Sequence, residues 1–77
     1  MQKFDEEKID ELTLALLYLV TDSDTGRAWK SFDWDTMDRL HRKELISDPR
    51  SKNKSVVLSD EGLRLSKLLF EKHCLLP

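Results

Sequence analysis

Apolar residues recur at helical spacing in the first quarter of the chain. The pattern predicts a helix over Asp5–Val20, capped by the Asp5 side chain. Its main stripe is formed by residues three or four positions apart, namely Ile9, Leu12, Leu16 and Leu19, and is widened by Ala15, Leu17 and Val20. An apolar surface of this width is typical of a helix that packs on two sides or is covered by a partner subunit.

Turn-forming residues between positions 21 and 26 end this pattern. The next segment, Arg27–Lys30, fits either a short strand or a helical turn. A second helix is predicted from Asp33 to Glu44, with Ser31 or Asp33 as its cap. One face of this helix carries Trp34, Met37, Leu40 and His41.

The second half of the chain reads as a β-hairpin followed by a helix. Leu45–Ser47 and Ser55–Leu58 form the two predicted strands, with Asp48–Lys54 as the tip. Ser59 then caps a last helix that runs through about His73. Because Gly62 weakens the first turn of this helix, we expect another part of the backbone to approach it closely.

These elements predict one α+β domain over residues 1–77, in the order helix, helix, β-hairpin, helix. A domain of this size needs its large side chains for its core. We therefore expect Trp29, Phe32 and Trp34 to be buried, and the alternative is an aromatic platform for bases or for a protein partner. The other expected core residues are Leu12, Leu16, Leu19, Met37, Leu40, Val57, Leu65, Leu68 and Leu69.

The composition is that of an ordered cytosolic protein. Of the 77 residues, 39% are hydrophobic and 36% are charged, which argues against a disordered chain. The longest apolar run, Leu14–Val20, is too short to span a membrane, and the acidic N-terminus does not resemble a signal peptide. The single cysteine, Cys74, cannot form a disulfide within the chain.

Two resemblances follow from these motifs. The run from Leu40 to Gly62, with Leu45-Ile46 and Val56-Val57-Leu58-Ser59-Asp60-Glu61-Gly62, resembles the recognition helix, wing and next helix of winged-helix regulators of the MarR and PadR groups. In this chain, only one clear helix precedes the counterpart of the recognition helix. The other resemblance is to a family of small bacterial proteins, domain of unknown function 6429, and it implies an ordered bacterial domain without implying an activity. It is carried by residues 14–19, 27–35, 38–41 and 45–49.

Charge is distributed unevenly along the chain. Residues 1–24 contain two lysines and seven acidic residues, whereas residues 39–54 contain six basic residues and two acidic ones. The basic segment is a candidate for contact with DNA phosphates, and its alternative is a solvated hairpin and helix end. The candidate nucleic-acid-binding residues are Arg39, Arg42, Lys43, Arg50, Lys52 and Lys54.

The sequence predicts no catalytic, metal or cofactor site. His41 is isolated, and neighbouring His73 and Cys74 point to different faces of a helix, so no paired metal-ligand spacing exists. Cys74 lies near a helix C-terminus, which does not favour a nucleophilic thiolate. We therefore predict a non-catalytic protein-interaction module without a small-molecule substrate.

The expected partner is a second copy of the chain or another protein. A small domain gains stability by dimerising, and the predicted symmetric homodimer buries parts of the first and last helices. Its candidate interface residues are Leu75 and Leu76, which could instead fold back onto the core or fray. The alternative function is a small winged-helix DNA-binding regulator that uses the basic hairpin tip.

Overall fold

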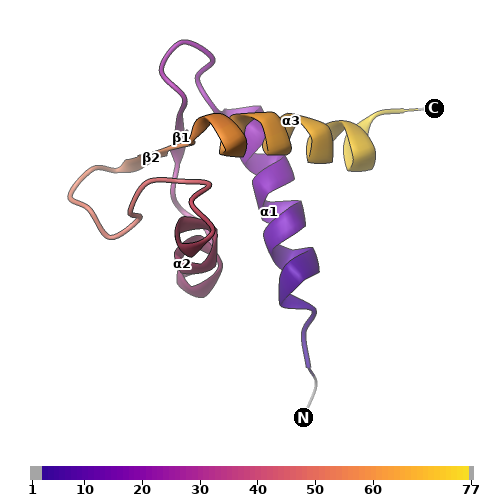
Figure 1. Cartoon of the computed structure of the whole chain (residues 1–77), viewed down its shortest axis with the longest axis horizontal. Coiled ribbons are helices and arrows are strands. Elements are labelled where there is room, and N and C mark those ends of the chain that lie inside the picture. The colour runs from indigo at the N-terminus through magenta and orange to yellow at the C-terminus, as the bar shows by residue number, and fades with distance from the viewer. Residues whose placement is uncertain (1–2, 77) are drawn as a thin grey trace.

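The computed structural model describes residues 3–76, which form three helices and two short strands (Figure 1). The fold is α+β and has the expected winged-helix-like order of helix, helix, β-hairpin and helix, with an additional strand after the first helix. Within the described range, no helix is long and apolar enough to cross a membrane. The elements are α1 (Glu6–Val20), β1 (Arg27–Trp29), α2 (Trp34–Arg42), β2 (Ser55–Val57) and α3 (Asp60–Cys74).

Each helix begins at a side chain that accepts a hydrogen bond from the first turn. The caps are Asp5 for α1, Asp33 for α2 and Ser59 for α3. Each cap side chain accepts a hydrogen bond from a backbone N–H group that has no partner within the helix. The predicted starts of α1 and α3 are confirmed, and the open choice for α2 is resolved as Asp33.

The sheet settles the structure of the segment after α1. β1 pairs antiparallel with β2, and Ala28 lies opposite Val56. Ile46 forms a bridge with Leu58, and the Ser47 N–H donates to the Val57 carbonyl oxygen at 2.8 Å. The first strand of the predicted hairpin is thus reduced to one bridge, on the edge of β2 opposite to β1. Arg27–Trp29 is a strand and not a helical turn.

The core lies between α1, the sheet and the inner side of α2, with leucines of α3 closing one side. Its buried apolar residues come from α1, α2, both strands and the segments beside β2: Leu14, Leu17, Ala28, Met37, Leu40, Leu45, Ile46, Val56 and Leu58. Leu65 and Leu69 of α3 pack against this group and are half-buried. Met37 and Leu40 are buried as predicted.

The prediction for the buried face of α1 was wrong. Leu12, Leu16 and Leu19 are 42%, 45% and 63% exposed, whereas Leu14 and Leu17 are almost fully buried. At 3.6 residues per turn, these two groups of leucines lie on opposite sides of the helix. Since both sides are apolar, periodicity did not show which one the other elements would cover.

Four further residues that were predicted to lie in the core are exposed. Trp34 begins α2 and is exposed beside the Arg50 side chain. Leu68 is exposed because the buried side of α3 is centred on Gly62 and Ser66. Trp29 and Phe32 are also exposed and do not belong to the core. Val57 is half-buried.

Candidate functional site

The side of α1 that faces away from the core carries a row of exposed leucines. Leu12, Leu16 and Leu19, called the outer stripe below, project opposite Leu14 and Leu17. An exposed apolar row of this kind is a surface that gains free energy when a partner covers it. The outer stripe is therefore the strongest candidate for an interaction surface.

The α3 helix covers one flank of α1 and leaves the outer stripe uncovered. The rings of Tyr18 and Phe70 lie 5.1 Å apart, centroid to centroid. On the same flank, Glu11 accepts hydrogen bonds from Lys72 at 3.1 Å and from His73 at 2.7 Å. These contacts hold the pKa of Glu11 below its ordinary value of 4.5, with the bond to His73 as the largest cause.

The predicted interface residues Leu75 and Leu76 follow the end of α3. Both side chains are exposed, and the chain runs outward beyond Cys74 (Figure 1). They therefore do not fold back onto the core. Leu75 and Leu76 are thus exposed apolar residues in addition to those of the outer stripe.

A buried carboxylate links α1 to α2. Asp10 is only 2% exposed. The Arg39 Nε donates to both of its carboxylate oxygens, at 2.8 and 3.1 Å, and the Lys43 Nζ donates at 2.8 Å. Burial lowers the pKa values of Arg39 and Lys43, but their hydrogen bonds and attraction to Asp10 raise both above the ordinary values. Asp10 therefore anchors α2 against α1.

Sequence reasoning missed this role of Asp10 because acids in a first turn are explained by the helix dipole. A signal was present in the pattern. Asp10 shares one helix face with Leu14 and Leu17, and its two cations lie four residues apart on α2. A carboxylate on an apolar face and an i, i+4 pair of cations on a neighbouring helix together indicate a buried ion pair.

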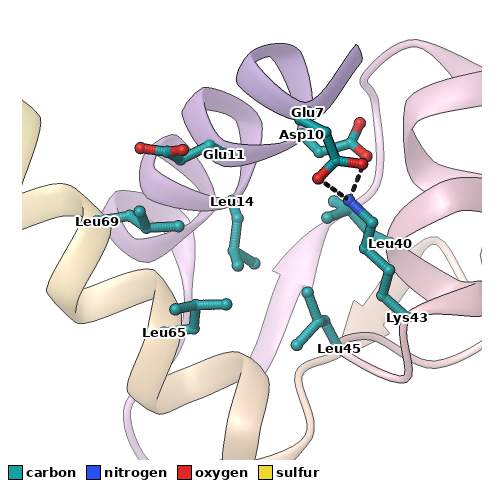
Figure 2. Close-up of a pocket in the computed structure, with 9 residues that line it drawn as sticks. All are labelled: Glu7, Asp10, Glu11, Leu14, Leu40, Lys43, Leu45, Leu65 and Leu69. Atoms are coloured by element: carbon teal, nitrogen blue, oxygen red, sulfur yellow. Dashed lines mark hydrogen bonds and ion pairs between the residues drawn. The ribbon is translucent and has the colours of Figure 1, made fainter.

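Near this ion pair, a hollow of about 300 Å³ opens between the three helices (Figure 2). Figure 2 shows leucine side chains from all three helices and from the segment after α2 around this hollow, with Glu7, Asp10 and Lys43 together on one side. Lys43 bridges Asp10 and Glu7 there, at 2.8 and 3.2 Å. The carboxylates at this hollow are thus engaged by cations of the same chain. The lining leucines are Leu14, Leu40, Leu45, Leu65 and Leu69.

The six candidate nucleic-acid-binding residues fall into two groups. Arg39 and Lys43 hold Asp10, and Arg50 forms two hydrogen bonds with Asp38, at 3.2 and 2.6 Å. The bond to Arg50 also lowers the pKa of Asp38. The other three are exposed and have no carboxylate within 4.0 Å among residues 3–76: Arg42, Lys52 and Lys54.

The histidines and the cysteine are separated. The His41 Nδ1 lies 3.1 Å from the Ile46 carbonyl oxygen, while the His73 Nε2 contacts Glu11. Cys74 is exposed at the end of α3. In the part of the chain that the structure describes, no three His, Cys, Asp or Glu residues are grouped as metal ligands.

Comparisons with known proteins give one family model and one similar protein. Residues 5–75 match the model of a domain of unknown function (DUF6429). An uncharacterised protein, y4hR of Sinorhizobium fredii (strain NBRC 101917 / NGR234), is 54% identical over 70 residues, which cover 91% of this chain and 93% of that protein. No solved structure matches the chain.

Proposed function

This chain belongs to the DUF6429 family, and we propose that it acts as a non-catalytic protein-interaction module that forms a symmetric homodimer. The outer stripe of α1 is the centre of the proposed interface. Leu75 and Leu76 contribute at its margin.

The observation that carries this proposal is the exposure of three leucines on one side of a regular helix. Complete burial of a leucine side chain contributes about 1.5–3 kcal/mol, and each of these leucines is already about half covered. Covering the remainder in two copies at once favours association. The same row on a second α1 is complementary in chemistry, because leucines pack against leucines across a two-fold axis.

The size of the domain favours a second copy as the partner. A chain of 77 residues buries a small core, and a shared interface adds apolar burial to it. The leucines on both sides of α1 then have separate roles. Leu14 and Leu17 build the monomer, and the outer stripe joins two monomers.

Light scattering after size exclusion tests this proposal through matched variants. Wild-type protein should have about twice the chain mass of 9.1 kDa. Leu16→Asp should give the monomer mass, because an unpaired carboxylate cannot be buried without a large cost. Leu68→Asp is the control, since Leu68 is an exposed leucine outside the outer stripe.

The double change Leu75→Asp and Leu76→Asp measures how much these two residues contribute to dimer stability. Dissociation of the dimer by this double variant would place both residues within the interface. A monomeric wild type, or a Leu16→Asp variant with the wild-type mass, would contradict an interface centred on α1.

A second candidate function is duplex DNA binding by the hairpin tip, which the winged-helix-like order favours. Arg42, Lys52 and Lys54 would contact phosphates, while Arg39, Lys43 and Arg50 would keep their pairs within the chain. Replacing Arg42, Lys52 and Lys54 by Gln should weaken retardation of duplex DNA. It should also reduce the slope of the binding constant against salt by up to about three units. Absence of retardation at low salt would remove this candidate.

A further inference from the structure

Trp29 is held at the surface by the register of the sheet. The preceding residue, Ala28, lies opposite Val56, and both side chains are buried in the core. Because side chains alternate along a strand, Trp29 must lie on the outer face. Its side chain is 61% exposed. The burial of Ala28 and Val56 thus fixes the indole on the outer face of the sheet.

Beside Trp29 the surface forms a shallow hollow of about 320 Å³. Two cations line it, Arg27 from β1 and Lys54 from the loop before β2. The Arg27 Nη1 donates to the Ser55 Oγ at 3.3 Å, and this bond ties the guanidinium to the strand opposite. The one acidic residue of the lining, Asp22, accepts the Asp24 N–H at 2.8 Å within its own turn.

Four cations in and next to β1 and β2 form no ion pair with the described residues. Arg27, Lys30, Lys52 and Lys54 have no carboxylate within 4.0 Å among the described residues. The Lys30 Nζ donates to the Ser51 carbonyl oxygen at 2.8 Å and so keeps the loop beside the end of β1. Two of these cations, Arg27 and Lys54, line the hollow beside the exposed indole.

An indole face and neighbouring cations match the two parts of a nucleotide. The base can stack on the ring, and the phosphates can lie beside the cations. A base in a duplex has both faces covered by its neighbours, so stacking requires an unpaired base. We propose that this surface binds single-stranded nucleic acid, with a base on Trp29 and the adjoining phosphates beside Arg27 and Lys54. The site lies outside the outer stripe and does not depend on the proposed homodimer.

The other tryptophan provides an internal control. Trp34 is exposed too, but the Arg50 guanidinium lies 5.2 Å from its ring centroid. Arg50 is in turn held by Asp38. The variant Trp34→Phe therefore replaces an indole that already has a cation beside it and leaves Trp29 as the single tryptophan.

Fluorescence titration of Trp34→Phe with a short oligothymidylate tests the proposal. Stacking of thymine on Trp29 should quench its emission. In the wild-type background, Trp29→Leu should weaken binding of a labelled oligothymidylate by about 5- to 150-fold, which corresponds to the loss of one stacked base. Replacing Arg27 and Lys54 by Gln should reduce the salt slope by about 1.4 units, or about 0.7 for each phosphate.

Two controls separate stacking from general charge and from loss of the fold. Lys67→Gln removes an exposed cation of α3 and should leave the binding constant close to that of the wild type. Trp29→Phe keeps an aromatic ring and should restore most of the affinity that Trp29→Leu loses. Circular dichroism of each variant verifies the fold.

Several outcomes would overturn the proposal. These are an unquenched Trp29, an affinity for oligothymidylate that does not change in Trp29→Leu, and a preference for duplex over single strand. Equal quenching by polyglutamate would show that the surface takes an acidic protein segment instead. None of these results bears on the mass of the protein, so they leave the dimer proposal separately testable.

Discussion

The α-carbon of Gly62 packs directly against the carbonyl oxygen of Leu45. A β-carbon at Gly62 would lie closer to this oxygen than van der Waals contact allows. The oxygen is fixed in place, because it also accepts the Ser59 N–H at 3.0 Å. The close backbone approach predicted at Gly62 is thus confirmed, and it joins the start of α3 to the segment that follows α2.

Substitution of Gly62 should reverse the usual order of helix propensity. Alanine favours a helix over glycine by about 1 kcal/mol. Here, however, Gly62→Ala should lower the free energy of unfolding by about 1–3 kcal/mol, because the added methyl group overpacks the contact with Leu45. Urea denaturation measures the change, with Lys67→Ala on the same helix as a near-neutral control. A more stable Gly62→Ala protein would refute the contact.

Glu44 is a non-glycine residue in the left-handed region, with φ at 62°. It follows the C-cap of α2, where its N–H donates to the His41 carbonyl oxygen and the Leu45 N–H donates to that of Leu40. Glycine is favoured at this position of such a helix end. Glu44→Gly should therefore stabilise the protein by about 0.5–1 kcal/mol. Thermal unfolding compares it with Glu44→Ala, which removes the carboxylate but retains the strain and should show no gain.

Asp10 should be far more important for stability than its acidic neighbour Glu7. Asp10→Ala leaves Arg39 without its buried partner and should lower the free energy of unfolding by about 3 kcal/mol. Glu7 also contacts Lys43, but its side chain is exposed, so Glu7→Ala should cost at most about 1 kcal/mol. Chemical denaturation of both variants provides the comparison. Equal effects would mean that Asp10 does not anchor α2.

The contact between Glu11 and His73 should make the free energy of unfolding depend on pH. The folded state lowers the pKa of Glu11, so the unfolded state binds more protons as the pH falls. The stabilisation is present above about pH 4.5 and is lost as the pH falls through the lower pKa of the folded state. Glu11→Gln should therefore show a shallower loss of stability below this pH than the wild type.

Denaturant titrations across this pH range provide the measurement for Glu11. The control is Glu71→Gln, because Glu71 is exposed on α3 and forms no ion pair with residues 3–76. Its pH profile should match that of the wild type. Identical profiles for the wild type and Glu11→Gln would contradict the assigned role.

Features that depend on local chemistry were predictable from the sequence. The starts of the helices follow from the cap residues Asp5 and Ser59, each of which satisfies N–H groups a few positions away. The need for glycine at position 62 followed from its cost to the helix. The order of the elements followed from the spacing of apolar residues.

Features that depend on tertiary packing were not predictable in the same way. The two apolar sides of α1 are equivalent in periodicity, and only the ion pair of Asp10 with α2 distinguishes the inner one. β2 pairs mainly with β1, although α2 separates these two strands in the sequence. The segment at Ile46 is nearer to β2 in the sequence but contributes one bridge. Trp29 is large and apolar, yet the buried pair Ala28 and Val56 forces it outward.

The most direct test of the outer stripe is an isotope-filtered nuclear Overhauser experiment on a mixture of labelled and unlabelled protein. It detects contacts between methyl groups of different copies. We expect intermolecular signals from Leu12, Leu16 and Leu19, and none from the buried Leu14 and Leu17. Intermolecular signals that arise elsewhere and leave the outer stripe silent, or no such signals at all, would contradict a homodimer centred on α1.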